Sequence, residues 1–187
     1  MRNRLGSGNI ELGMGNPMAV NQLIAHHSVI FKPSSQLVWV STSPYQLGKF
    51  VAYDLNKVFS LTRDQIILNN EIYTDELTIP ADTFLYSENY KNYTIYLRMT
   101  EELKLYTKRM NPLPASFEQS YILTNPGLYL TYSYLGDYYS NLKDYNRAYS
   151  YYQIALSKEV AGIDQRDKLI MASGDSFKKG NNINVGN

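Results

Sequence analysis

The feature that most constrains this chain is the spacing of aromatic, glycine and alanine residues along residues 129–162. A tetratricopeptide repeat has an aromatic residue, a Leu-Gly pair and a second aromatic on its first helix, then Ala, an aromatic and Ala on the second. The seven matching positions are Tyr132, Leu135, Gly136, Tyr139, Ala148, Tyr152 and Ala155. We therefore expect one helix-turn-helix pair here, with a role in packing or docking and not in chemistry.

The residue types fit that geometry. Two antiparallel helices approach closely only where side chains are small, as at Gly136 and Ala148, and aromatic rings then fill the space beside them. Asp144 is the expected N-cap of the second helix. Val160 stands where the repeat usually has proline, so Gly162 is expected to end that helix instead.

Helices on either side are expected to cover the repeat, because a single repeat leaves one face unburied. Apolar residues at helical spacing predict a helix that begins at Ser87 and stops before Pro112. Residues 164–179 are expected to form a capping helix, and residues 181–187 a disordered tail. The inward-facing residues of that cap would be Leu169, Ala172 and Phe177.

The chain contains 18 tyrosines, an unusual number. A phenol buries a ring and keeps a polar tip, which suits half-exposed helix surfaces or an interface. Tyrosine in place of Leu or Phe in an ordinary core fits equally well. Packing within the chain is the favoured role of the repeat, and capture of a protein partner is the alternative.

The first part of the chain has β-branched and aromatic runs broken by Pro and Ser. These predict strands at residues 23–31 and 36–42, joined by a turn at 32–35. Residues 49–59 are expected to form a third strand, although a short helix fits nearly as well. Residues 62–82 are expected to be a loop with short extended pieces.

Composition excludes several classes of function. With no Cys, the chain has no disulfide, thiolate metal site or cysteine nucleophile, and its two His are too few for a histidine metal site. The net charge of +1, with scattered Lys and Arg, does not favour nucleic-acid binding. Apolar runs are shorter than the roughly 20 residues of a membrane helix, and residues 1–15 lack a signal-peptide core. We expect no metal, cofactor, nucleic acid, membrane span or targeting signal.

Few side chains are candidates for chemistry. His26 and His27 are neighbours on a predicted strand, so they point to opposite faces and cannot act on one proton or ion. A single His can be a general base near neutral pH, although a lone strand His is more often structural. The Gly-rich residues 1–17 match neither G-x-G-x-x-G nor the P-loop, and no Ser has the G-x-S-x-G context.

The segment HHSVIFKPSSQLVWVSTSPYQLGKFVAYDL resembles the closing strands of acyl-coenzyme A:6-aminopenicillanic acid acyltransferase-like proteins. These are N-terminal-nucleophile (Ntn) hydrolases with an αββα sandwich. Their hairpin has the form H-S-V-x-F-x-P followed by V-x-V-S. The matching residues here are His27, Ser28, Val29, Phe31, Pro33, Val38, Val40 and Ser41. A bacterial branch appends tetratricopeptide-like helices after the hairpin, which is the order seen here, and the resemblance covers about residues 10–60 plus the repeat.

The resemblance implies acyl transfer, or hydrolysis of an amide or thioester, by a Cys exposed through self-cleavage. Its own α-amino group would serve as base, and backbone or Asn donors would hold the oxyanion. No catalytic residue is carried over, because this chain has no Cys and begins with Met1. Asn21 and His27 are candidates to line a substrate pocket, and Asn16 lies nearby, but none aligns with a known donor.

The sequence thus predicts an α+β chain. Residues 1–85 would be the terminal strands of an Ntn-type sandwich, and residues 86–180 an all-α segment with one tetratricopeptide-like repeat. The expected function is that of the C-terminal portion of such an enzyme, inactive alone, whose partner is the missing N-terminal part of the domain. Its unpaired strand edges would favour association. The alternatives are a protein-interaction module that uses the repeat and a complete enzyme that uses His27 with a Ser.

Overall fold

The computed structural model describes residues 3–62 and 72–185, and they form an α+β protein with two compact units. One unit contains Asn3 and the described part of Val20–Ser87. The other contains Arg4–Ala19 and the helices that follow Ser87. The expected β-containing domain of residues 1–85 is therefore wrong at its N-terminal end, because residues 4–19 belong to the helical unit.

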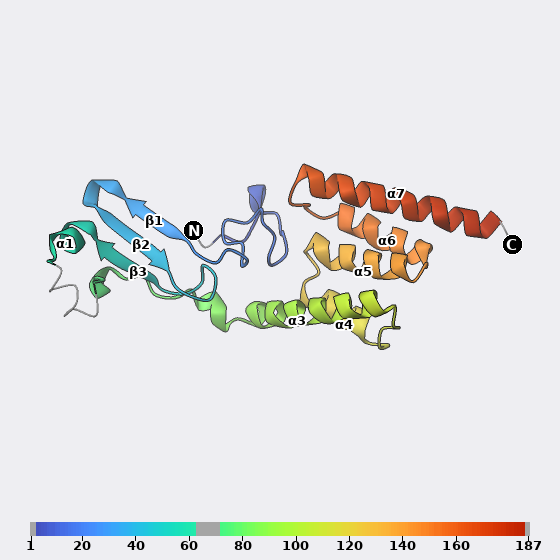
Figure 1. Cartoon of the computed structure of the whole chain (residues 1–187), viewed down its shortest axis with the longest axis horizontal. Helices are drawn as coiled ribbons and strands as arrows, with labels where there is room; N and C mark the ends of the chain where they lie inside the picture. The colour runs from blue at the N-terminus through green and yellow to red at the C-terminus, as the bar shows by residue number, and fades with distance from the viewer. Residues whose placement is uncertain (1–2, 63–71, 186–187) are drawn as a thin grey trace. The chain divides into compact units, whose positions relative to one another are not determined.

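The first unit is built on a three-stranded antiparallel sheet with the order β1-β2-β3 (Figure 1). The strands are β1 (Val29–Lys32), β2 (Leu37–Ser41) and β3 (Phe50–Asp54). The 3-10 turn η2 (Pro33–Ser35) joins β1 to β2 as expected, and Gln36 closes it in the left-handed conformation with φ 52°. The predicted hairpin and third strand are confirmed at this level.

Two boundaries in this unit differ from expectation. The first strand begins at Val29 and not at residue 23, because Leu23 adopts a left-handed φ of 56° that interrupts an extended chain. Residues 49–59 contain both of the expected alternatives, since the helix α1 (Leu55–Ser60) follows β3 directly. Asp54 caps α1 by accepting a hydrogen bond from the Asn56 N–H at 3.0 Å.

The segment after α1 is irregular where it is described. It contains the 3-10 turns η3 (Asp75–Leu77) and η4 (Thr83–Tyr86), and Ile79 forms an isolated bridge to Phe50 of β3. These features agree with the expected loop over residues 72–82, whereas residues 63–71 lie outside the described part of the chain.

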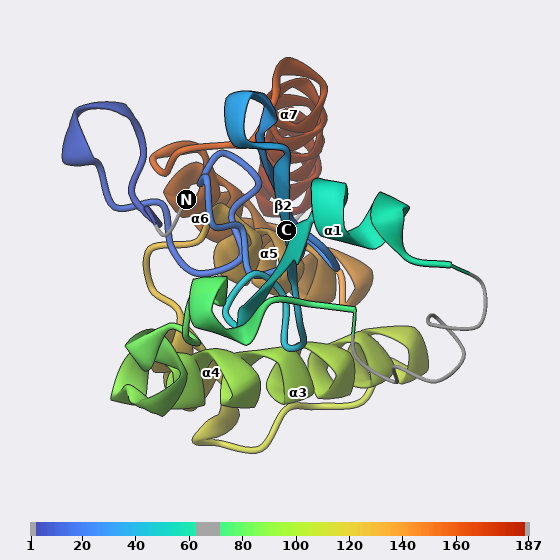
Figure 2. The same ribbon diagram turned by 90° about the vertical axis from the view of Figure 1, so that its left-hand side faces the viewer.

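The second unit consists of five α-helices and the N-terminal segment that carries the 3-10 turn η1 (Ser7–Asn9). The helices are α3 (Glu88–Arg109), α4 (Phe117–Thr124), α5 (Tyr129–Asn141), α6 (Tyr145–Leu156) and α7 (Ile163–Val185). Helix α3 packs against α4 and α5, α5 against α6, and α6 against α7 (Figure 2). Neighbours therefore lie on both sides of the α5–α6 pair, as the sequence predicts.

The α5–α6 pair occupies the positions expected from the repeat spacing, and all seven of its pattern residues are buried. Asp144 is the N-cap of α6, and its carboxylate accepts the Arg147 N–H at 3.2 Å. Helix α6 ends at Leu156, so the expected stop at Gly162 is wrong. The carbonyls of Gln153 and Ile154 close this end on the Ser157 N–H.

The last helix departs from its expected form. It runs to Val185, so residues 181–185 continue the helix and do not form the expected disordered tail. Leu169 is buried as expected and Ala172 is half-buried. Phe177 is 51% exposed, but its ring lies against that of Tyr149 on α6, with the centroids 5.2 Å apart. The other buried residues on the inner face of α7 are the small residues Ser173, Ser176 and Gly180. No helix in the described ranges is long and apolar enough to cross a membrane.

The closest approach of α5 and α6 provides a stability test. Gly136→Ala is expected to lower the free energy of unfolding by about 1–2 kcal/mol, because overpacking outweighs the gain in helix propensity. A Cβ at this position would lie 2.6 Å from Cε1 of Tyr152. The matched control is Gly174→Ala in α7, where a Cβ meets nothing within 4 Å and a gain of about 0.5–1 kcal/mol is expected. Denaturant unfolding followed by circular dichroism measures both, and shifts of the same sign would contradict the close approach.

Candidate functional site

The two candidate pocket residues occupy different environments. Asn21 is 1% exposed, and neither its side-chain nitrogen nor its oxygen has a hydrogen-bond partner among the described residues. His27 is exposed and precedes β1, as does His26, so the expectation that both lie on a strand is wrong. No described contact joins Asn21 to His27. The buried Asn21 amide is therefore the more informative of the two.

Asn16, in contrast, has a structural role in the helical unit. Its side-chain Nδ2 donates to the carbonyls of Leu12 at 3.1 Å and Glu159 at 3.0 Å, and its Oδ1 accepts the Met18 N–H at 3.0 Å. All three bonds are internal to this unit. Asn16 therefore links the N-terminal segment to the loop that follows α6, and it is not a free oxyanion donor.

A second asparagine, Asn125, holds the same segment to the helices. Its Oδ1 accepts the Met14 N–H at 3.0 Å and its Nδ2 donates to the Met14 carbonyl at 2.8 Å. Beside this pair, Gly13 lies so close to Leu128 that a Cβ would be 2.3 Å from the Leu128 nitrogen. Gly13 also has a φ of 75°, so glycine is required here. Local sequence patterns do not reveal this attachment, because Met14 and Asn125 are 111 positions apart in the chain.

The two faces of the sheet differ sharply. Register places six apolar or aromatic side chains on one face, and none of them is buried. Phe31 is the most open of these side chains, at 67% exposed. We call this surface the open sheet face; its residues are Val29, Phe31, Val38, Val40, Val51 and Tyr53. On the opposite face Ser41, Phe50 and Ala52 are buried.

This composition is unusual for a surface in contact with water. An antiparallel sheet with one solvated face normally alternates apolar residues toward the core with polar residues toward water. Here β2 carries Val38 and Val40 on the open side, between neighbours that are equally apolar. The open sheet face therefore has the character of a surface that another layer covers.

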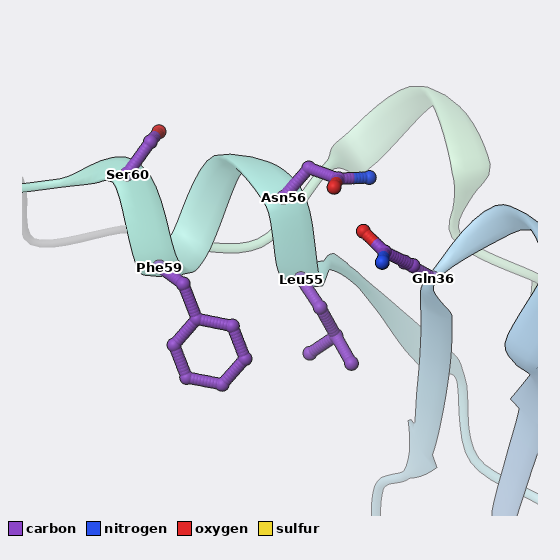
Figure 3. A pocket seen from close by; sticks show the side chains of 5 residues that line it. All are labelled: Gln36, Leu55, Asn56, Phe59 and Ser60. Atoms are coloured by element: carbon purple, nitrogen blue, oxygen red, sulfur yellow. The ribbon is translucent and has the colours of Figure 1, made fainter.

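A shallow pocket of about 440 Å³ lies along α1. Its lining residues are Gln36, Leu55, Asn56, Phe59 and Ser60 (Figure 3). None of these residues has an acid or base that titrates near neutral pH. The pocket can accept an apolar group beside two amides, and it offers no chemistry.

A polar cluster in the helical unit is centred on Glu118 of α4. Its carboxylate accepts hydrogen bonds from the hydroxyls of Tyr139 on α5 and Tyr151 on α6. The two rings stack with centroids 5.7 Å apart, and Arg147 Nη1 donates to the Tyr139 oxygen at 3.2 Å. This cluster joins three helices, and each carboxylate oxygen of Glu118 accepts one phenol hydroxyl, which fits a structural role.

Burial dominates the electrostatics of these phenols. Burial, aided by the hydrogen bond to Glu118, raises the pKa of Tyr139 to about 12, while Arg147 opposes the rise. Burial also raises the pKa of Asp137, whose carboxylate accepts the Tyr152 hydroxyl at 2.8 Å. These groups stay protonated or paired near neutral pH and support the helix packing.

Within the described ranges, no three His, Asp or Glu side chains are grouped to hold a metal ion. No family model matches the chain, and no curated protein or solved structure is significantly similar to it. The molecule is an α+β protein with a small antiparallel sheet and a helical unit. The surface that sets it apart is the open sheet face, with the unpaired Asn21 amide in the same unit.

The Glu118 cluster predicts a specific alkaline behaviour. Tyr139 is expected to keep its proton to about pH 12 in the folded protein, whereas an unfolded Tyr loses it near pH 10. The stability linked to Tyr139 is thus complete below pH 10 and is lost as pH rises from 10 to 12. Ultraviolet titration of phenolate formation, with Tyr139→Phe to assign the signal, measures this.

In the same titration, Glu118→Gln is expected to lower the pKa of Tyr139, because a neutral amide no longer repels the phenolate. Glu102→Gln on the exposed side of α3 removes the same charge away from the cluster and should leave Tyr139 unchanged. An unaltered Tyr139 titration in Glu118→Gln would show that the carboxylate does not act on it.

Proposed function

We propose that this chain is the C-terminal portion of an Ntn-type acyltransferase or amide hydrolase whose nucleophile lies on another polypeptide segment. The observation that carries the proposal is the open sheet face. In a sandwich, a second sheet packs face to face at about 10 Å and buries the inward side chains of both. The hairpin that resembles the closing strands of that family, residues 27–41, supplies four of the six open-face residues.

The magnitude of the uncovered surface supports such a layer. Burying one Val or Phe side chain contributes about 1.5–3 kcal/mol, so covering the face contributes on the order of 10 kcal/mol before the costs of ordering and docking. That contribution is comparable with the whole stability of a small domain. The face is therefore suited to a permanent partner layer and not to a brief encounter.

Asn21 supports the proposal independently. A buried amide without partners costs about 1–3 kcal/mol, and a role in a binding or catalytic site is one physical reason for a protein to keep a group in that state. In an acyl-transfer site, a preorganised amide N–H donates to the oxygen that becomes negative when the nucleophile attacks the carbonyl. We assign that role to Asn21. His27 is proposed only as an exposed residue near the substrate entrance.

The decisive experiment begins by sequencing the DNA that flanks the gene for this chain. Any in-frame segment found there that carries a Cys is then expressed together with the chain. Acyl release from N-acyl amides and thioesters is expected only when both are present. Asn21→Ala should lower kcat by about 10²–10³, whereas Asn56→Ala on α1 should have no effect. Turnover by this chain alone, or an unrelated gene at that place, would overturn the proposal.

Stability measurements test the open sheet face separately. In the chain alone, Phe31→Ser should lower the free energy of unfolding by less than about 1 kcal/mol, because Phe31 is largely exposed. In the complete protein the same change should cost about 3 kcal/mol, since the ring would be buried by the second sheet. Phe59→Ser on α1 is the control and should have a small effect in both. Equal costs for Phe31→Ser in the two contexts would mean that no layer covers this face.

A second candidate is a protein-interaction module in the helical unit. It is favoured by a pocket of about 260 Å³ between α3 and α5, lined by Leu103, Lys104, Thr107, Lys108, Tyr134 and Asp137. The Lys104 ammonium lies 5.3 Å from the Tyr134 ring centroid, so a cation and an aromatic face are presented together. This second function is favoured if the chain is monodisperse alone and no Cys-bearing segment is encoded next to it.

A further inference from the structure

Buried asparagines occur at three places in the described ranges, and two of them use both polar atoms of the side chain. Asn16 and Asn125 each donate from Nδ2 and accept on Oδ1. Asn21 is equally buried, at 1% exposed, but neither its Nδ2 nor its Oδ1 has a hydrogen-bond partner among the described residues. Two adjacent open groups, one donor and one acceptor, therefore distinguish Asn21 from the asparagines that hold the fold together.

Asn125 shows which kind of partner such an amide takes. Its Oδ1 accepts the N–H of Met14 at 3.0 Å, and its Nδ2 donates to the carbonyl of the same residue at 2.8 Å. The oxygen and one N–H of a side-chain amide lie on the same edge, so they match a backbone residue that presents its N–H and its C=O on one side. The same pair of groups is open on Asn21.

The backbone that carries Asn21 is held in place. The Asn21 backbone N–H donates to the Asn3 carbonyl at 2.8 Å. Leu23, two residues later, is 0% exposed and has a left-handed φ of 56°. A non-glycine residue keeps that conformation only when the surrounding structure holds it. The Asn21 side chain therefore starts from a fixed backbone, which reduces the entropy lost when a ligand binds to it.

We propose that Asn21 binds the N–H and the C=O of a single α-amino acid residue of a ligand. A fatty acyl group has only the C=O and would leave Oδ1 without a donor. The identification of this residue as the acyl group rests on the proposed function, in which Nδ2 donates to the carbonyl oxygen that becomes negative. The substrates of that reaction are then aminoacyl or peptidyl compounds and not fatty acyl ones.

The reaction of an amide substrate places each half of the Asn21 amide. The Cys sulfur of the other segment forms a bond to the carbonyl carbon, its thiol proton passes to the α-amino group of that Cys, and the C=O electron pair moves to the oxygen on Nδ2. When the C=O re-forms, the C–N bond breaks and the leaving amine takes the proton from the α-amino group. The bond from the substrate α N–H to Oδ1 persists throughout and orients the acyl group.

Nuclear magnetic resonance of the isotope-labelled chain tests this recognition without any nucleophile. The probes are N-acetyl-L-alanine N-methylamide and O-acetyl-L-lactic acid N-methylamide, which has an ester oxygen in place of the alanine N–H. The alanine probe is expected to shift the side-chain N–H signals of Asn21, which are assigned by their loss in Asn21→Leu. The lactic acid probe should bind at least about tenfold more weakly, because Oδ1 stays unpaired.

Three variants serve as controls. Asn21→Leu should bind the two probes equally and should raise the unfolding midpoint, because it removes two unpaired polar atoms. Asn125→Leu should lower the midpoint, since it breaks both bonds to Met14. Asn56→Ala, exposed on α1, should keep the preference between the probes. Equal binding of the probes to the unaltered chain, unchanged Asn21 signals, or equal losses of stability in the two Leu variants would each overturn the inference.

The measurements separate this inference from the proposed function. A preference for the alanine probe in the chain alone supports the inference, and an absence of turnover in the complete protein would then overturn only the proposed function. Turnover with equal kcat/KM for N-acetylalanyl and O-acetyl-lactyl amides would overturn only the inference.

Discussion

The helical unit depends on the close approach of α5 and α6 at Gly136, where the ring of Tyr152 occupies the space that a side chain would fill. The hydroxyl of the same residue donates a hydrogen bond to the carboxylate of Asp137, which follows Gly136 in α5. One tyrosine thus provides both the apolar contact and the polar anchor between the helices. A buried phenol needs a hydrogen-bond partner for its hydroxyl, and Asp137 supplies that partner here.

The use of tyrosine follows from this kind of packing. Tyr138 places its ring in the core, accepts the Leu113 N–H and donates to the Asn111 carbonyl, both at 3.0 Å. In the loop after α3, these two backbone groups therefore have a side chain as their hydrogen-bond partner, where a helix would have supplied backbone partners. Phe could fill the same volume but would leave those backbone groups without a partner. Neither interpretation of the tyrosine content describes Tyr138, whose ring is buried in the core while its hydroxyl bonds to two backbone groups.

The parts predicted correctly from sequence are those specified by local spacing. The α5–α6 pair, the Asp144 cap and the hairpin at β1 and β2 depend on neighbours within about one turn or one strand. The incorrect or missing predictions concern features that local residue patterns do not determine. Leu23 breaks the first strand through a backbone conformation that its residue type does not favour, and the open sheet face becomes visible only when register aligns β1 with β3 through β2.

The two hydrogen bonds between Asn125 and Met14 determine where the chain can be cut to separate the two units. The segment Arg4–Ala19 belongs to the helical unit, yet Val20–Ser87 separates it from those helices in the chain. From Arg4 onward, the polypeptide therefore passes from the helical unit into the sheet unit and back again. A protein shortened to begin at Glu88 would lack the buried Leu12 side chain and the Asn16 link, so its helices would be left with a gap in their core. In this order of segments, Val20–Ser87 is an insertion in the helical unit. Deleting Val20–Ser87 and joining Ala19 to Glu88 would therefore leave the helical unit with all of its segments.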